Sequence, residues 1–380
     1  MELKNLQKHI RTLAILPETN APVVSCYMTL KKGRIDDRIA FEEQIRSLKE
    51  SVSGKTWRDL RDALDPVDQY LAEELLPDAI GAAIFSRAGE DPFFLPLQFR
   101  VPLPNWVALN STPNIYHLVE LKDTYDRYVV LISTRESVSI LAINLGAVTE
   151  ELWTENSQTR NRVGREWTKE HYQKHRKERG QKFLKEKVKI LDQLMSAGGY
   201  ARLILAGHPT STTQVRKALP KHLLMKLVDI VRVSGKAPIS DVVKTTIASF
   251  IEAEEKESQA VVETLSKQVR TGGLAVAGTT ASYQTLRRGQ VDSLVLAKNY
   301  APGLVWACTV CEFFSPARKR PATCSECGAA ELKNFDLKEE MVRVAERQGC
   351  MVEVVNESEA LSQLGGVGCL LRYRLLEDYS

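Results

Sequence analysis

Two closely spaced cysteine pairs place the strictest local demand on how this chain folds. Cys308 and Cys311 form one CxxC pair, Cys324 and Cys327 form another, and twelve residues separate the pairs. A CxxC turn brings two thiolates to one side of the backbone, so two such turns can complete a tetrahedral site of four sulfurs. Four soft thiolates favour Zn²⁺ or iron over Mg²⁺ or Ca²⁺. Because all four positions are filled, we predict a structural zinc ribbon over about residues 303–334.

The chain has seven cysteines in total, an odd number that does not suit a framework of disulfides. Redox-active pairs are the alternative for the four clustered cysteines, but a redox pair does not need a second pair at ribbon spacing. Cys26, Cys350 and Cys369 occur in apolar, strand-like segments. We expect these three to be unreactive residues of the core.

The length and composition are those of a globular protein with several domains. At about 100–200 residues per domain, 380 residues predict two or three domains. Hydrophobic residues make up 43% of the chain and charged residues 26%, which excludes fibrous and wholly disordered proteins. No run of about 18 apolar residues is present, and the N-terminal segment lacks the apolar core of a secretory signal. We therefore expect a soluble cytoplasmic protein without a membrane partner.

The order of apolar segments predicts a mixed α/β protein of three domains, of which the first is α+β. Residues 1–122 form the predicted first domain, 123–254 the middle domain and 255–380 the C-terminal domain. In the middle domain, two runs rich in β-branched residues, 128–133 and 138–145, predict a hairpin. A long basic helix is expected to follow this hairpin.

Local signals predict single elements in the two outer domains. Residues 41–52 have the pattern of an amphipathic helix, and Asp36 or Asp37 can cap its start. The strand around Pro96 is expected to be bent or at a sheet edge, because proline cannot donate a hydrogen bond to a neighbouring strand. Residues 274–297 predict a strand, a helix and a second strand in βαβ order.

Positive charge is concentrated in one segment of the chain. The whole chain has 52 Lys and Arg against 48 Asp and Glu, a formal net charge of +4. Residues 158–189 contain twelve basic and four acidic residues, so this segment carries +8 and the rest of the chain −4. A cation-rich segment on a weakly acidic protein is typical of polyanion binders.

The basic segment combines an arginine-rich loop with a helix predicted to begin near Thr168. Arginine binds phosphate through two parallel hydrogen bonds, and the tryptophan of the loop can stack on an unpaired base, so the segment suits structured RNA. A solvated helix face with a mobile loop is the alternative, but acidic partners at i, i+4 spacing are sparse. The predicted RNA-binding residues are Arg160, Arg162, Arg165, Trp167, Lys169, His171, Lys174, Arg176, Lys177 and Arg179.

The order of these parts resembles a known family. The segments GLAVAG (273–278) and GQVDSLVL (289–296), the CxxC pairs and the closing LGGVGCLLRY (364–373) are similar to the C-terminal domain of archaeal and eukaryotic class I release factors and of Pelota. The cysteine pairs fall where archaeal release factors carry a zinc mini-domain. The strand pair, loop and basic helix resemble the family's middle domain. STPNI (111–115) and DTYDRYVV (123–130) look like the bacterial branch of the superfamily.

The chain departs from release factors at their catalytic motif. Release factors present Gly-Gly-Gln on the middle-domain loop, where the Gln helps to place a water against the peptidyl-tRNA ester. Matching the following helix at Thr168, Tyr172 and Phe183 puts the sequence REW of residues 165–167 in that position. The first domain also lacks the Asn-Ile-Lys-Ser and Tyr-x-Cys-x-x-x-Phe motifs of stop-codon reading. We therefore expect neither ester hydrolysis nor codon reading.

Members of the superfamily that lack the hydrolytic motif act in rescue of stalled ribosomes, as Pelota does, or in dormancy, as Balon-like hibernation factors do. The resemblance implies a three-domain factor that occupies the ribosomal A site, contacts rRNA and works with a translational GTPase related to elongation factor Tu. We predict a non-hydrolytic ribosome-binding factor of hibernation or rescue, which is not an enzyme. The chain contains no GxxxxGK[ST] nucleotide-binding motif of its own.

Two other functions stay open. A peptidyl-tRNA hydrolase with an altered loop would need Gln158 or Glu166 to position the attacking water. A non-ribosomal RNA-binding protein could reuse the same frame, because the first domain differs most from the family.

Overall fold

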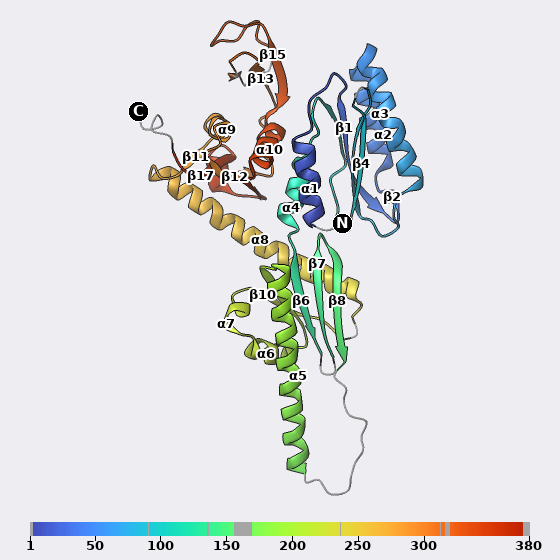
Figure 1. Cartoon of the computed structure of the whole chain (residues 1–380), viewed down its shortest axis with the longest axis vertical. Coiled ribbons are helices and arrows are strands. Elements are labelled where there is room, and N and C mark those ends of the chain that lie inside the picture. Colours follow the sequence, from blue (N-terminus) through green and yellow to red (C-terminus); the bar gives the residue numbers. More distant parts are fainter. Residues whose placement is uncertain are drawn as a thin grey trace. The chain divides into compact units, whose positions relative to one another are not determined.

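The fold is described by a computed structural model, and the chain divides into two compact units (Figure 1). The first unit combines Leu3–Thr124 with Glu255–Ser380, and the second unit is Tyr125–Glu254. The first and third domains predicted from the sequence thus fall within one unit, and the three-domain division stays a prediction. The structure describes residues 3–89, 91–134, 137–155, 169–235, 237–311, 313–315 and 320–374, with the backbone alone for residues 3, 4, 137, 152–155 and 169–183.

The N-terminal part of the first unit is an antiparallel sheet with helices on it. Strand β1 lies at its centre, between β3 and β5, and β4 lies beyond β3 at the edge. In chain order the elements are α1 (Leu3–Ala14), β1 (Val23–Lys31), β2 (Arg34–Ile35), α2 (Arg38–Ser51), α3 (Gly54–Glu73), β3 (Gly81–Arg87), β4 (Phe93–Phe99), β5 (Trp106–Asn110) and α4 (Tyr116–Thr124).

Several local predictions for this sheet are confirmed. Helix α2 is capped by Asp37, whose Oδ1 accepts a hydrogen bond of 3.1 Å from the Ala40 N–H. Pro96 lies in β4, which pairs with β3 alone and is therefore an edge strand. Successive side chains of β1 point to opposite faces of the sheet. Cys26 packs in the hydrophobic cluster with α2 and α3, whereas the centroid of the Tyr27 ring lies 5.7 Å from that of Phe85.

The second unit is a mixed sheet with helices on both faces. Its strand order is β10-β9-β6-β7-β8, in which β6, β9 and β10 run parallel and β7 and β8 continue antiparallel. The predicted hairpin is confirmed as β6 and β7. The elements are β6 (Tyr128–Ser133), β7 (Ser137–Asn144), β8 (Ala147–Glu155), α5 (Lys169–Gly198), β9 (Arg202–Gly207), α6 (Pro209–Ala218), α7 (Lys221–Leu224), β10 (Leu227–Arg232) and the first half of α8 (Ile239–Arg270).

Alternating strand residues of the second unit point into two separate cores. Val129 packs with Leu191 of α5 and Val215 of α6 on one face. On the other face Tyr128 stacks on Phe250 of α8, with ring centroids 4.6 Å apart. The described part of the chain has no helix that combines the length and apolar composition needed to cross a bilayer.

The C-terminal part of the first unit has its own sheet, with the cysteine ribbon inserted after β12. The sheet order is β11-β17-β12-β16, and a separate three-stranded sheet of order β14-β13-β15 forms the ribbon. The elements after α8 are β11 (Ala275–Ala277), α9 (Thr279–Arg287), β12 (Val291–Ala297), β13 (Leu304–Cys308), β14 (Phe314–Ser315), β15 (Leu332–Asp336), α10 (Leu337–Gln348), β16 (Met351–Val355), α11 (Glu359–Gln363) and β17 (Val367–Leu371).

The strand order of this sheet has one feature that the βαβ prediction does not contain. Strands β11 and β12 do not pair with each other, because β17 from the end of the chain lies between them and is antiparallel to both. Gly368 of β17 permits this close packing. A Cβ at this position would lie 2.7 Å from Leu265 Cδ2 and 3.0 Å from the Val276 carbonyl oxygen.

Helix α10 of the C-terminal part caps helix α4 of the N-terminal part. The Glu339 carboxylate accepts hydrogen bonds from the Ile115 N–H at 2.8 Å and the Tyr116 N–H at 3.0 Å, which lie at the start of α4. Lys338 Nζ lies 3.6 Å from the centroid of the Tyr116 ring. Burial raises the pKa of Glu339 to about 7 and lowers the pKa of Lys338 to about 8. The first N–H groups of α4 therefore find their acceptor on a helix more than 200 residues away.

The other end of α4 is also fixed to the C-terminal part. Lys122 forms an ion pair with Glu346 of α10, and the Glu346 side chain is only 2% exposed. Gln7 of α1 donates to the second oxygen of Glu346 at 3.0 Å. Asp123 accepts a hydrogen bond of 2.8 Å from the Val354 N–H of strand β16. Together with the Glu339 contacts, these bonds form what we call the α4–α10 junction.

Candidate metal centre and RNA-binding segment

Two backbone turns position the four clustered cysteines. Cys308 ends strand β13, where it pairs with Leu332 of β15. The second cysteine pair lies in the loop before β15, and its turn is closed by a hydrogen bond of 2.9 Å from the Gly328 N–H to the Cys324 carbonyl. Gly328 has a φ of 72°, a left-handed conformation in which a side chain would be strained. This explains the glycine directly after the second CxxC pair.

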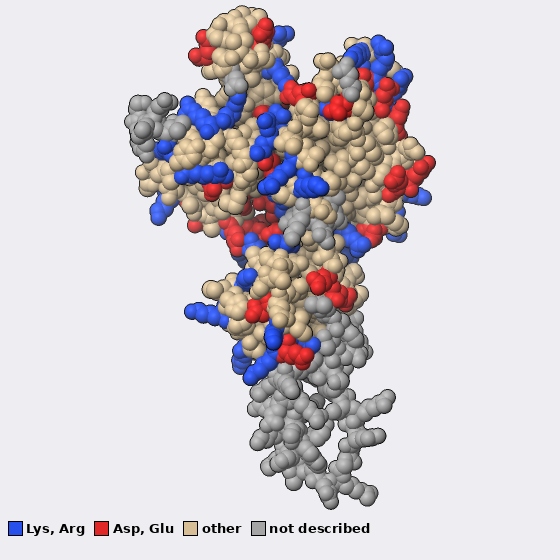
Figure 2. All heavy atoms as spheres, in the orientation of Figure 1, with Lys and Arg blue, Asp and Glu red and all other residues tan. Residues whose placement is uncertain are grey.

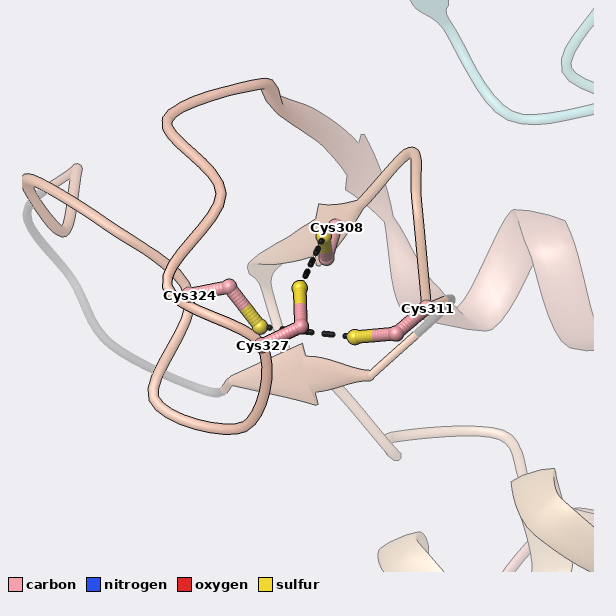
Figure 3. Close-up of side chains that lie close together, drawn as sticks. All are labelled: Cys308, Cys311, Cys324 and Cys327. Atoms are coloured by element: carbon pink, nitrogen blue, oxygen red, sulfur yellow. Dashed lines mark hydrogen bonds between the residues drawn. The ribbon is translucent and has the colours of Figure 1, made fainter.

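The four sulfurs point toward one another (Figure 3). The Cys308 and Cys327 sulfurs are 3.5 Å apart, as are those of Cys311 and Cys324, and all four lie within 4.8 Å of one another. A disulfide needs a separation of about 2.05 Å. Four sulfurs at about 2.3 Å from one tetrahedral Zn²⁺ lie about 3.8 Å apart. The arrangement could therefore hold one tetrahedral metal ion, and the predicted convergence of the four cysteines is confirmed.

Hydrogen bonds from the backbone favour a thiolate in the cluster. The N–H groups of Cys311 and Val310 lower the pKa of the Cys308 thiol to about 7, and the Val310 nitrogen lies 3.4 Å from its sulfur. The Phe313 N–H acts in the same direction on Cys311, but the nearby Cys327 sulfur raises the pKa of Cys311 to about 12. Since a metal must displace the protons that remain, its affinity for the cluster rises with pH.

An aromatic contact joins the ribbon to the C-terminal sheet. Tyr283 of α9 meets Phe314 of β14 with ring centroids 5.0 Å apart, and Phe335 of β15 at 6.2 Å. Tyr283 is buried, and this burial raises the pKa of its hydroxyl to about 12. Aromatic packing therefore holds the ribbon against the C-terminal sheet, in addition to the cysteine cluster.

The other three cysteines lie in the core, as predicted. Cys26 and Cys369 have no exposed surface, and Cys350 is 5% exposed. Burial raises the pKa of Cys26 and of Cys369 to about 12. Such thiols stay protonated and are poor nucleophiles.

The structure describes no side chains for most of the predicted RNA-binding segment. Arg160, Arg162, Arg165 and Trp167 fall outside the described residues altogether. Helix α5 begins at Lys169, close to the start predicted at Thr168. The backbone alone is described for the other predicted residues, which are Lys169, His171, Lys174, Arg176, Lys177 and Arg179. Their role in RNA binding stays a prediction.

The described half of α5 shows which side of the helix faces solvent. Leu191 and Met195 have no exposed surface and pack on the sheet, whereas Lys185 and Lys189 are exposed. Lys187, which also contributes to the basic segment, is only 4% exposed. These lysines belong to the basic segment of residues 158–189 but not to the predicted RNA-binding residues.

The chain is similar to proteins of translation termination. Residues 113–250 match the profile of bacterial archaeo-eukaryotic release factor family 10. Peptide chain release factor subunit 1 of Pyrococcus abyssi (strain GE5 / Orsay) is 25% identical over 291 residues, which cover 70% of each chain. The protein of the same name from Thermococcus onnurineus (strain NA1) is 24% identical over 291 residues, which cover 70% of this chain and 69% of the relative.

Among solved structures, a model of ribosome-bound archaeal Pelota and ABCE1 matches 98% of this chain and 94% of its own, with 16% identity and a TM-score of 0.43.

The family 10 profile covers α4 and almost all of the second unit. The profile match and the curated relatives confirm the resemblance to the release factor and Pelota superfamily, in its bacterial branch.

Proposed function

We propose that this release-factor-like protein binds the ribosome without hydrolysing peptidyl-tRNA, and that it acts in hibernation or rescue. One observation carries the proposal. The family match covers the middle of the chain, yet residues 165–167 read REW where release factors carry Gly-Gly-Gln. The relatives named as release factors support a role in translation. The replaced motif supports occupancy of the A site without catalysis.

The physical reason lies in the size and charge of the three residues. Adjacent glycines let a backbone approach a substrate closely, because they carry no Cβ and adopt conformations that other residues avoid. Arg, Glu and Trp at 165–167 are bulky, and none of them provides the carboxamide of Gln. A loop of this composition would fill the space in which an attacking water must lie.

The charge distribution supports rRNA as the contact. The +8 segment of residues 158–189 can neutralise phosphates, and each neutralised phosphate releases counterions. Binding through such contacts weakens steeply as the salt concentration rises. We also propose Zn²⁺ as the ion of the cysteine cluster, with a structural role, and a translational GTPase related to elongation factor Tu as a partner.

Two assays on one ribosomal complex test the proposal. The protein is expected to co-sediment with ribosomes at low salt and to release no labelled peptide from a complex that holds peptidyl-tRNA. Changing Arg160, Arg162 and Arg165 together to Ala is expected to weaken sedimentation and to flatten its salt dependence. A control with Ala at Arg34, Lys49 and Arg58 removes the same charge from exposed positions of the first unit.

The same assays separate the alternatives. Failure to sediment at low salt would refute ribosome binding. Peptide release that is lost after Gln158→Ala or Glu166→Ala would instead identify a hydrolase with an altered loop. Crosslinking that recovers mRNA or tRNA without rRNA would identify a non-ribosomal RNA-binding protein.

A further inference from the structure

We propose that the RNA-binding surface continues beyond α5 onto helices α6 and α7, and that a phosphate backbone of RNA lies across all three. The residues of this surface are Lys185, Lys189, Arg216, Lys217 and Lys221, which we call the α5–α7 patch. The inference rests on the proposed function, because it takes RNA as the ligand. Its residues on α6 and α7 add a contact area that the basic segment of residues 158–189 does not contain.

The three helices present their outer sides next to one another. Val188 of α5, Val215 of α6 and Leu223 of α7 are buried in one core on the same face of the sheet. Helices α5 and α6 are in contact. His222 Nε2 of α7 lies 2.8 Å from Asp192 Oδ1 of α5, which joins these two helices at the surface. The sides of the helices opposite this core therefore form one continuous surface.

All five residues of the patch are exposed, and no carboxylate in the described part of the chain forms an ion pair with them. Residues 209–224, which include α6 and α7, contain no acidic residue. Figure 2 shows Lys and Arg side chains on the surface over α6 and α7. On α5 the exposed Glu186 is next to Lys185, whereas Arg216, Lys217 and Lys221 have no acidic neighbour in sequence. Like charges that gather in this way repel one another unless an external anion joins them.

Helix-end effects explain only part of this arrangement. Arg216 and Lys217 lie in the last turn of α6, where the helix dipole favours cations. Lys221 is the first residue of α7, where the dipole does not favour a cation. Lys185 and Lys189 lie inside α5, away from either end. An external anion is therefore the better explanation for the patch as a whole.

The helical repeat connects the patch to the predicted RNA-binding segment. Positions 185 and 189 are one turn apart on the exposed side of α5. Positions 182 and 174 precede position 185 by three and eleven residues, which places them on the same side of the helix backbone. Both of these positions are lysines. Position 178 precedes position 185 by seven residues, lies on the same side and is a glutamate, so this side of α5 alternates in charge. Residues 209–224 contain no acidic residue, so α6 and α7 supply the uniformly basic part of the surface, which suits the repeated charges of a nucleic acid backbone.

The test compares two double variants that remove equal charge from the second unit. Lys217→Ala with Lys221→Ala changes the patch, whereas Arg232→Ala with Lys244→Ala changes exposed cations on β10 and α8. Binding to a purified structured rRNA fragment is measured by filter binding at 50 to 200 mM salt. The patch variant is expected to bind at least about tenfold more weakly, and the log–log salt slope to fall by about two. The control is expected to keep the slope of the unchanged protein.

Folding and ligand class are controlled in the same experiment. Both variants should unfold at the same temperature as the unchanged protein, because all four side chains are exposed and none of them forms a hydrogen bond or ion pair in the described part of the chain. Equal salt slopes for the patch variant and its control would overturn the inference, even if the unchanged protein sediments with ribosomes. Loss of binding to phosphatidylserine vesicles with rRNA binding unchanged would also overturn it, since the patch would then serve a membrane surface.

The two proposals can fail separately. If the unchanged protein does not sediment with ribosomes but binds the rRNA fragment through the patch, the ribosomal function is lost and the RNA surface stands. If it sediments normally and the patch variant behaves as the control does, the ribosomal function stands and the RNA surface is lost.

Discussion

The cysteine ribbon and the α4–α10 junction lie in the same compact unit and are held together in opposite ways. In the ribbon, four sulfurs within 4.8 Å of one another come from a stretch of only twenty residues, Cys308 to Cys327. In the junction, carboxylates and lysines join residues that are more than 200 positions apart, as in the pair of Lys122 and Glu346. One region is a local ligand set, and the other is a long-range polar network.

This difference predicts different sensitivities. Metal binding can fold the ribbon by itself, because the ligands are close in sequence and little chain entropy opposes their approach. The junction needs two distant parts of the chain to be folded already, and it then depends on the pairing and protonation of its charged groups. Loss of metal should therefore leave the junction intact, and loss of a junction contact should leave the metal bound.

Cys308→Ser should have the largest effect on the ribbon. Removing one of four thiolates is expected to reduce bound zinc from about one per chain to none, since structural zinc contributes on the order of 10 kcal/mol to local folding. Zinc content by mass spectrometry and protease cleavage within residues 303–334 measure the effect. Cys350→Ala is the matched control, because that buried cysteine lies outside the cluster and zinc should be retained. Full zinc content in the Cys308 variant would refute the four-sulfur site.

Lys122→Ala should have the largest effect on the junction. It leaves the Glu346 carboxylate, 2% exposed, without its cation, and such a change costs about 3–5 kcal/mol of unfolding free energy. Urea unfolding with zinc present measures the loss, and zinc content should not change. Lys122→Met combined with Glu346→Leu should recover most of the stability, because it removes both charges together. A double variant as unstable as Lys122→Ala would show that the charge pair is not the cause.

The contrast between these regions also explains what the sequence could predict. The four cysteines, a cap of α2 at Asp36 or Asp37 and the β6–β7 hairpin depend on residues near one another in the chain, and all three were predicted, with Asp37 as the actual cap. Helix α3 was missed, and Pro66 inside it is a residue that usually ends helices. The position of β17 between β11 and β12 was missed as well, because no local pattern encodes which distant strands become neighbours.

The candidate RNA-binding surface depends partly on local sequence and partly on long-range packing. The net charge of residues 158–189 identified the basic segment, because charge density is a local property. The same count could not include Arg216 and Lys221, since only the packing of α6 and α7 against the α5 side of the sheet brings these residues next to it. The Glu339 contact to α4 is a further example, because an acceptor 224 residues from its donor leaves no periodic signal.

Glu339→Ala should have a smaller effect than Lys122→Ala. It removes the acceptor of the Ile115 and Tyr116 N–H groups and is expected to cost about 2–3 kcal/mol. Glu42→Ala is the control, because Glu42 pairs with Arg38 of its own helix at exposed positions, and such surface pairs contribute less than about 1 kcal/mol. Urea unfolding measures both. Equal losses for the two variants would mean that the cap on α4 contributes nothing specific to the junction.

The smallest effect should be a pH dependence of the unfolding free energy that arises from the ionisation of Glu339. Burial raises its folded-state pKa from 4.5 to about 7, with Asp336, Lys338, Tyr27 and Tyr116 as the titratable groups around it. Between these two values the folded protein binds more protons than the unfolded chain. Stability therefore falls as the pH rises through this window, in the opposite direction to that of a carboxylate held ionised by an ion pair.

Glu339→Gln separates this titration from the hydrogen bonds, because the amide oxygen still accepts from the N–H groups of α4 but cannot ionise. With zinc kept saturating, the unfolding free energy of the unchanged protein should fall by about 1–2 kcal/mol between pH 5 and pH 7, and that of the variant should stay nearly level over the same interval. The two proteins should have similar stability at pH 5, where the Glu339 carboxyl is protonated. Parallel pH profiles would show that Glu339 ionises normally, and the junction would then be held by ionised groups alone.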